Sequence, residues 1–181
     1  MFLKAANQRV DSDTLCRRFA PPSLAVHARP RTTTFREIDA RDVPELFEIR
    51  TSTRENRMTM QALGSIGITP DSTVKALSVS VAGWLCEVSG KIVDFSMRNK
   101  NTGEMLVVAV LPEYENRGIG KRLMALIQEW LFAQGHEEIW LLENPDPQVR
   151  AYGFYRKLGW VAARFHDSGQ QILKLSTPRG W

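Results

Sequence analysis

The sequence contains only two cysteines, Cys16 and Cys86, and no long hydrophobic run. Two isolated thiols exclude a disulfide framework and a cysteine-rich metal site, and they fit a reducing compartment. No apolar segment approaches the roughly 20 residues that a membrane-spanning helix needs, so we expect no membrane partner. Together these absences predict a soluble, cytoplasmic protein.

Most of the chain also lacks an excess of charge of either sign. Residues 1–33 hold six Lys or Arg and two Asp, a net charge of +4, which equals the net charge of the whole chain. Of 24 basic and 20 acidic residues, 18 of each therefore remain in residues 34–181. A neutral remainder provides no broad electrostatic footprint for nucleic acid, which argues against nucleic acid as a partner.

Residues 1–33 differ from the rest in composition as well as charge. They contain three prolines, a run of threonines from Thr32 to Thr34 and little apolar periodicity, which favours a flexible basic tail. An Arg-rich transit peptide is a sharper alternative, although Asp11, Asp13 and the prolines argue against it, and a start codon placed too far upstream would explain the tail equally well. With 43% hydrophobic residues, we expect residues 34–181 to form one domain with a single core.

The most informative segment runs from an apolar strand through a glycine turn into an amphipathic helix. Residues 106–111 predict a buried strand that Pro112 ends, and apolar residues then recur at helical spacing from Leu123 to Leu131. Gly118 and Gly120 lie where strand becomes helix, and unpaired N–H groups at a helix start attract anions. The segment therefore predicts a phosphate-binding turn. The alternative is a merely tight turn, because a third glycine and the Lys-Ser/Thr of a P-loop are both missing.

The remaining pattern predicts the order β-α-α-β-β-β-α-β-α-β-β. Thr69 and Pro70 are typical of a helix start, Gly135 of a helix end, and residues 54–69 are less regular. This order indicates an α/β domain with a largely antiparallel sheet and one parallel crossing around the glycine helix. The other expected segments are a first strand around residues 35–38, a helix that Asp39 or Asp42 could cap, strands at 84–88, 92–97, 139–142, 160–165 and 171–175, and a helix at 148–158.

A second motif, from Gln148 to Trp160, gives the glycine turn a context. Together the two segments resemble the GNAT superfamily of acyl-CoA-dependent N-acetyltransferases. The first match is Val110-Leu111-Pro112 followed by residues 115–120, against the family's V-x-P and (Gln/Arg)-x-x-Gly-x-(Gly/Ala). The second is residues 148–160, against N-x-x-A-x-x-Φ-Y-x-K-L-G-(F/W), and the spacing between the two fits without gaps.

The resemblance implies a GNAT-like sheet flanked by helices, with a splayed strand before a glycine loop that binds coenzyme A. Acetyl-CoA would be the co-substrate, and no metal is implied. The backbone of Val108, Ala109 and Val110 would align the pantetheine arm and the thioester, and Gln148 would contact the same arm. The pyrophosphate would lie on the loop formed by Asn116, Arg117, Gly118, Ile119, Gly120 and Lys121.

Two residues depart from the family pattern. Glu115 replaces the usual Gln or Arg, and since a carboxylate would repel a pyrophosphate, we expect Glu115 to point to solvent. Gln148 replaces the usual Asn and is one methylene longer, although it keeps the amide group.

Two catalytic roles follow from the resemblance. Tyr155 matches the family's tyrosine and would protonate the departing thiolate, although a tyrosine in a helix can also be a packed aromatic. Glu143 lies at the strand end where some family members place a general base. Its alternative is an exposed charge beside a loop.

The expected function is transfer of an acetyl group from acetyl-CoA to a primary amine by direct attack in a ternary complex. The alternative is a non-catalytic acyl-CoA sensor of the same fold, and a third reading is a nucleic-acid-associated protein that works through the tail. The acceptor is not identified by any motif, and a homodimer is left open. Arg50, Arg54, Asn56 and Arg57 could meet an acidic acceptor or form a solvated helix face.

Overall fold

The computed structural model describes residues 32–55 and 57–177. Residues 1–31 of the predicted tail lie outside the described residues. Within them, seven strands form one sheet in the order β1-β2-β3-β4-β5-β7-β6. No helix in this part of the chain is long and apolar enough to cross a membrane. The strands are β1 (Thr33–Glu37), β2 (Val81–Val88), β3 (Lys91–Asn99), β4 (Glu104–Val110), β5 (Glu138–Glu143), β6 (Val161–Phe165) and β7 (Gln171–Ser176).

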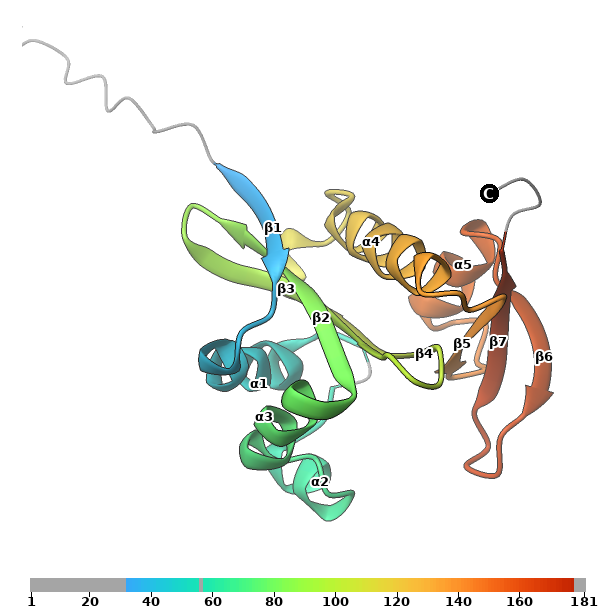
Figure 1. Ribbon diagram of the computed structural model, residues 1–181, viewed down its shortest axis with the longest axis horizontal. Coiled ribbons are helices and arrows are strands. Elements are labelled where there is room, and N and C mark those ends of the chain that lie inside the picture. Colours follow the sequence, from blue (N-terminus) through green and yellow to red (C-terminus); the bar gives the residue numbers. More distant parts are fainter. Residues whose placement is uncertain (1–31, 56, 178–181) are drawn as a thin grey trace, which may run out of the picture. The chain divides into compact units, whose positions relative to one another are not determined.

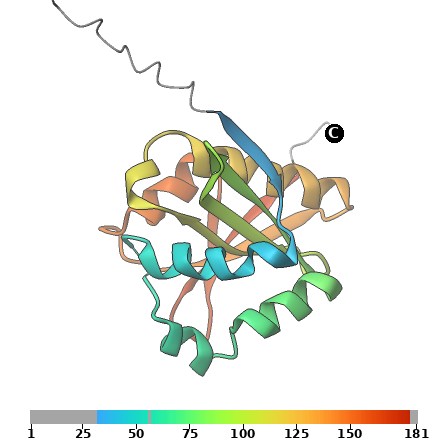
Figure 2. The ribbon, with the colours of Figure 1, turned by 90° about the vertical axis from the view of Figure 1, so that its left-hand side faces the viewer.

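Helices cover both faces of this sheet (Figures 1 and 2). One face carries α1 (Val43–Ser52), α2 (Met60–Ser65) and α3 (Pro70–Val79), and the other carries α4 (Ile119–Ala133) and α5 (Arg150–Lys157). Short 3-10 turns, η2 (Ala40–Asp42) and η3 (Pro112–Tyr114), precede α1 and follow β4.

The sheet has the mixed topology that the element order predicted. Only β4 and β5 pair in parallel, and every other pair of neighbouring strands in the described sheet is antiparallel. The chain crosses from β4 to β5 through α4, as a parallel pair requires. The predicted fold class, a largely antiparallel sheet flanked by helices, is therefore confirmed.

Local chemistry explains most helix boundaries. Thr69 and Ser72 form a capping box at the start of α3, and Gly135, with φ of 91°, follows the end of α4. The segment predicted to be irregular contains α2, whose first turn is capped by the Thr59 hydroxyl. Helix α5 begins at Arg150 and not at Gln148, because the Asp146 carboxylate holds the Gln148 N–H in a preceding turn.

Helix α4 joins the two main hydrophobic clusters of the domain. Its first turns place Ile119 and Leu123 against β2, β3 and β4, while Met124, Ile127 and Leu131 pack with β5 and β7. These apolar residues are all buried, so the helix that carries the glycine turn is held rigidly against the sheet.

Two charged residues of β3, Asp94 and Arg98, lie buried on the face that α4 covers. The Arg98 guanidinium stacks between the rings of Trp84 and Trp130, at 4.0 and 3.9 Å from their centroids. Burial lowers the pKa of Arg98 to about 10. Asp94 lies near the first turn of α4, where a Cβ added to Gly120 would be 3.7 Å from Oδ2 of Asp94.

Candidate active site

The parallel strands β4 and β5 separate soon after they meet. They pair only at Glu104 with Trp140 and at Met105 with Leu141. The next residue, Leu106, is an extra residue in the β3–β4 ladder, which makes a β-bulge at the point of separation. This is the splayed strand that the sequence analysis predicted.

Beyond the bulge, Val108, Ala109 and Val110 pair with β3 on one edge and have no partner in β5 on the other. Ala109 is buried, and the valines are half-buried. Their backbone on the open edge can therefore donate to and accept from an extended, amide-containing ligand, while the side chains contribute to the core.

The predicted anion-binding loop lies at the start of α4. Asn116 and Gly118 have positive φ angles of 60° and 78°, and no side chain caps the helix. The first helical hydrogen bond runs from the Arg122 N–H to the Gly118 carbonyl at 3.1 Å, so the three preceding N–H groups are the unpaired ones of a helix start. A Cβ on Gly118 would have no atom within 4 Å, which leaves room for a close ligand. This loop fits a pyrophosphate.

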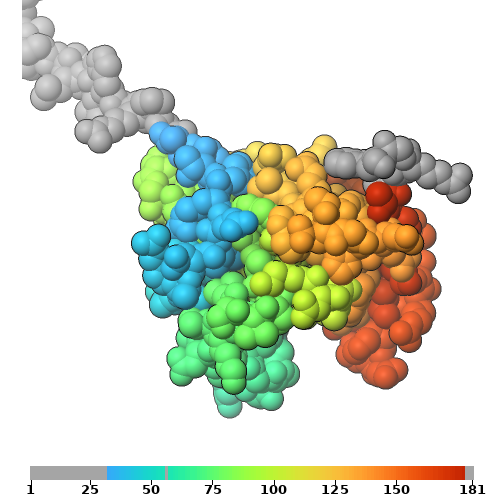
Figure 3. All heavy atoms as spheres, viewed as in Figure 1, coloured from blue at the N-terminus to red at the C-terminus, as the bar shows by residue number. Residues whose placement is uncertain are grey.

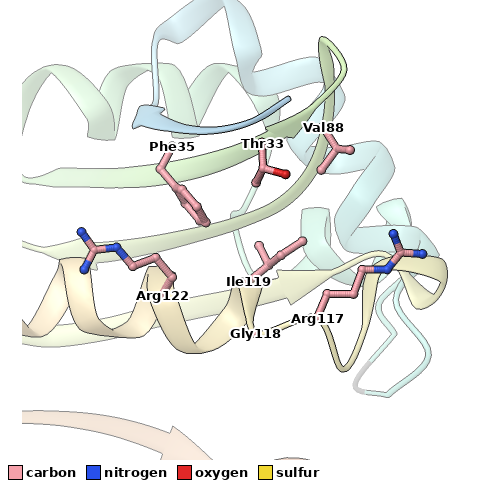
Figure 4. A pocket seen from close by; sticks show the side chains of 7 residues that line it. All are labelled: Thr33, Phe35, Val88, Arg117, Gly118, Ile119 and Arg122. Atoms are coloured by element: carbon pink, nitrogen blue, oxygen red, sulfur yellow. The ribbon is translucent and has the colours of Figure 1, made fainter. Parts of the chain in front are cut away.

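Positive charge surrounds the loop on its exposed side. Arg117 and Lys121 are exposed, and the Arg117 guanidinium lies 4.9 Å from the centroid of the Tyr114 ring. A pocket of about 400 Å³ reaches the same loop from the β1 side of the helix. In Figure 4, Phe35 and Ile119 point into the space between β1 and α4, and Arg117 and Arg122 lie toward its two ends.

The prediction for Glu115 is wrong. Only 10% of its side chain is exposed, and its Oε2 lies 2.6 Å from Nη1 of Arg150 and 3.9 Å from Nε of Arg54. The two guanidinium groups attract the carboxylate away from solvent, and they offset the negative charge that would otherwise face an anion at the loop.

Gln148 lies on the exposed connection between β5 and α5. Its backbone N–H donates to Asp146 across 2.9 Å, so the residue is fixed in a turn just before the helix. Its position near the start of α5 is compatible with the predicted contact to a pantetheine arm, which stays a prediction.

Tyr155 lies half-buried on α5. Its ring packs edge-on against Phe154 and Trp160, with centroids 5.4 and 6.3 Å apart. Burial, and then the negative charge of Glu143, raises the pKa of Tyr155 to about 12. The phenol therefore stays protonated throughout the physiological pH range, as a proton donor must.

Glu143 ends β5 with a fully buried side chain, which excludes the exposed charge considered as its alternative. Its Oε1 lies 2.6 Å from Nη1 of Arg156, an ion pair without the alignment of a good hydrogen bond. Burial raises the pKa of Glu143, and the Arg156 guanidinium acts in the opposite direction. A carboxylate with a raised pKa binds a proton more readily than an exposed one. The structure thus brings Glu143 close enough to Tyr155 for its charge to influence the protonation of the phenol.

Two residues that sequence reasoning did not single out belong to this region. Arg156 pairs with Glu143, stacks 3.4 Å from the centroid of the Tyr152 ring and donates to Gln171. Arg150 pairs with Glu115 from the first turn of α5. Among residues 32–55 and 57–177, no three His, Cys, Asp or Glu side chains group in a way that could hold a metal ion.

Solved structures of known proteins share this architecture. The chain is similar to the PaiA N-acetyltransferase of Thermoplasma acidophilum in complex with coenzyme A, with a TM-score of 0.68 and 16% identity over 81% of this chain and 99% of that one. It is also similar to the ribosomal-protein-S18-alanine N-acetyltransferase of Escherichia coli, with a TM-score of 0.63 and 16% identity over 83% of this chain and 99% of that one.

A third similar structure is yncA from Salmonella typhimurium, a putative acetyltransferase with its cofactor acetyl-CoA. Its TM-score is 0.64 and its identity 13%, over 83% of this chain and 99% of that one. No curated protein matches the chain. The model of the acetyltransferase (GNAT) family matches residues 61–160, which include β4, the glycine loop, α4, β5 and α5. The chain therefore belongs to the GNAT acetyltransferase family.

Proposed function

We propose that this protein is an N-acetyltransferase that moves the acetyl group of acetyl-CoA to a primary amine by direct attack in a ternary complex. The observation that carries the proposal is the opening between β4 and β5, with the uncapped start of α4 at one end. An open strand edge and an anion-binding helix start, set side by side, suit a ligand with amide groups and a pyrophosphate. Two of the similar structures hold coenzyme A or acetyl-CoA, which supports this assignment.

Each part of the site has a role in the proposal. Backbone N–H groups of residues 116–121 bind the pyrophosphate, with Arg117 and Lys121 adding positive charge. The open edge of Val108–Val110 aligns the pantetheine arm and orients the thioester carbonyl, and Gln148 contacts the arm from the α5 side. The acetyl group is thereby held in the opening, where the acceptor amine can reach it.

The chemistry needs one proton removed and one proton supplied. Glu143 accepts the proton of the attacking amine, directly or through water, as the nitrogen bonds to the thioester carbon. Tyr155 donates its phenolic proton to the sulfur as the carbon–sulfur bond breaks. The departing thiolate, related to a cysteine with a pKa near 8.5, takes this proton as it leaves, and general acid–base catalysis contributes about 10²- to 10⁴-fold to a rate.

The first proton transfer assists the second. The negative charge of Glu143 is one cause of the raised pKa of Tyr155. When Glu143 becomes neutral by accepting the amine proton, that cause disappears, and Tyr155 becomes a better acid at the moment the thiolate leaves. Arg156 keeps Glu143 ionised until the amine arrives.

The acceptor approaches, in this proposal, along the side where α1, α2 and the β6–β7 hairpin lie. In Figure 3 the molecular face is hollowed between the green α2–α3 region and the orange-red hairpin. Of the arginines that could meet an acidic acceptor, Arg54 pairs with Glu115, and Arg57 donates to the Thr51 carbonyl at 2.8 Å. Asn56 lies outside the described residues. Because Arg54 and Arg57 already bind groups of this protein, a solvated helix face is favoured over a binding site for an acidic acceptor.

A screen of amines with acetyl-CoA, monitored by release of the free CoA thiol, tests the proposal. The panel contains small polyamines, lysine peptides and peptides with free N-termini, so that one experiment separates the acceptor classes. We expect release that depends on the amine. Acetyl-CoA binding without release from any amine would instead favour the acyl-CoA sensor.

A further inference from the structure

Charged side chains from three separate segments meet at the head of the glycine loop. Glu115 precedes the loop, Arg150 is the first residue of α5, and Arg54 follows α1. The Glu115 side chain is only 10% exposed, and its carboxylate pairs with both guanidinium groups, whose own side chains are 50% and 66% exposed. Glu55 completes the cluster, since its carboxylate accepts the Arg150 backbone N–H at 3.0 Å.

The shortest contact of the cluster links the two walls of the proposed coenzyme cleft. Arg150 Nη1 donates to Glu115 Oε2 across 2.6 Å, although 35 residues separate the two in sequence. Glu115 immediately precedes the loop that would bind the pyrophosphate, and Arg150 belongs to α5, the helix that carries Tyr155. The ion pair therefore lies beside the path that an extended coenzyme would take.

The same contact provides a cation that an incoming phosphate could use. An arginine head that is half exposed can reorient at little cost, and its planar donors match a phosphate as well as they match a carboxylate. Glu115, in contrast, is nearly buried and carries a like charge to the pyrophosphate. The carboxylate and the pyrophosphate thus compete for one guanidinium.

We propose that Arg150 is a ligand of the coenzyme pyrophosphate, and that Glu115 lowers the affinity for coenzyme A by competing for it. This inference rests on the proposed function. The Arg150 guanidinium passes from the carboxylate to a phosphate oxygen when the coenzyme binds. In the family motif, Gln or Arg is usual at the position of Glu115. The glutamate therefore weakens coenzyme binding, which keeps coenzyme exchange fast.

Substitutions at the two positions should change the affinity for coenzyme A in opposite directions. Glu115→Gln removes the competitor with little change of shape, and we expect the dissociation constant to fall about threefold to tenfold. Arg150→Gln removes the phosphate ligand, and we expect the constant to rise about tenfold. In the double variant the gain from Glu115→Gln should disappear, because no guanidinium remains to be released.

Isothermal titration calorimetry of the full-length variants tests the inference with three ligands. Coenzyme A carries the pyrophosphate, while 4′-phosphopantetheine carries one phosphate and pantetheine none. We expect large effects with coenzyme A, smaller ones with phosphopantetheine and none with pantetheine. Arg41→Gln, which removes another exposed guanidinium from a surface pair at 3.6 Å, is the matched control and should leave all affinities unchanged. Thermal unfolding of each variant checks that it is folded, and Arg150→Lys, which keeps the charge, should retain part of the affinity.

The outcomes separate this inference from the proposed function. Coenzyme A binding that is insensitive to both substitutions, or effects of equal size with pantetheine, would overturn the role of Arg150 and leave the proposed function standing. Failure of the wild-type protein to bind coenzyme A would overturn both.

Discussion

At the scale of single residues, Tyr155 has the most specific proposed role. Tyr155→Phe keeps the ring contacts with Phe154 and Trp160 but removes the acidic proton. We expect kcat to fall about 10²-fold or more, with little change in the KM for acetyl-CoA, in initial-rate measurements from pH 6 to pH 9. Tyr152→Phe, on the same helix, is the control and should remain active. An unchanged rate for Tyr155→Phe at every pH would remove the tyrosine from the mechanism.

The protonation state of Glu143 should make the rate depend on pH. Because burial raises its pKa, the carboxyl is protonated over a wider acidic range than an exposed glutamate, and a protonated carboxyl cannot accept the amine proton. The rate of the wild-type enzyme should therefore fall as the pH decreases through that raised pKa. Glu143→Gln should lose about 10²-fold in kcat and lose the part of the acidic limb that follows the Glu143 pKa, while the part set by protonation of the free amine remains. If the pH profile kept its full wild-type shape, another group would be the base.

Asp94 predicts a stability change that is independent of catalysis. Burial raises the pKa of the Asp94 carboxyl to about 9. The nearby Phe95 N–H acts in the opposite direction, but its effect is smaller because it makes no hydrogen bond of good geometry to the carboxyl. In the unfolded chain the group ionises near pH 3.9. Between that pH and about pH 9 the unfolded chain loses a proton that the folded protein keeps. The free energy of unfolding is therefore highest below about pH 3.9 and declines by up to about 1.4 kcal/mol per pH unit toward pH 9.

Urea unfolding at several pH values measures this effect. The free energy of unfolding of the wild type should fall relative to that of Asp94→Asn as the pH rises from 5 to 8. A difference between the two proteins that stays constant with pH would show that Asp94 is ionised in the folded state.

At the scale of elements, the β2–β3 pairing depends on one glycine. A Cβ on Gly83 would overlap the backbone carbonyl oxygen of Ser96 and lie 2.6 Å from Cδ1 of Ile38. Since a backbone atom in a central strand cannot move aside cheaply, Gly83→Ala should destabilise the fold by about 1–3 kcal/mol. Gly64→Ala in α2, where a Cβ meets nothing within 4 Å, is the matched control and should be neutral or slightly stabilising. Thermal unfolding compares the two, and equal midpoints would contradict the close packing of β2 on β3.

The elements themselves could largely be predicted from local signals. Thr69 with Pro70, the glycines after α4 and α5, and the apolar run of β4 each act over a few residues, so the sequence alone indicates them. Helix α2 was missed because its six residues have one buried side chain, Leu63, and hence no apolar period. The buried polar residues of β3 were missed for a related reason, since polar residues alternating with apolar ones are typical of a solvated strand face.

At the scale of the whole domain, the candidate site depends on contacts between distant segments, which no local sequence pattern indicates. The pair Glu115 and Arg150, the cap that Glu55 provides to α5 and the pair Glu143 and Arg156 all depend on how β4, α4, β5 and α5 pack. Motif spacing indicated which residues to expect at the candidate site. It gave the wrong surroundings for Glu115, because charge pairing between distant segments decides where a long side chain points.

The splay of β4 from β5 opens the sheet between the glycine loop and α5, the helix that carries Tyr155. The central claim, direct transfer of an acetyl group to an amine, is tested most directly by single-turnover product analysis. Enzyme in excess over acetyl-CoA is mixed with an amine from the screen, and acetylated amine and free CoA thiol are quantified together. Both products should appear at the same rate and in equal amounts. Thiol released without acetylated amine, or acetyl-CoA that stays intact beside every amine, would contradict it.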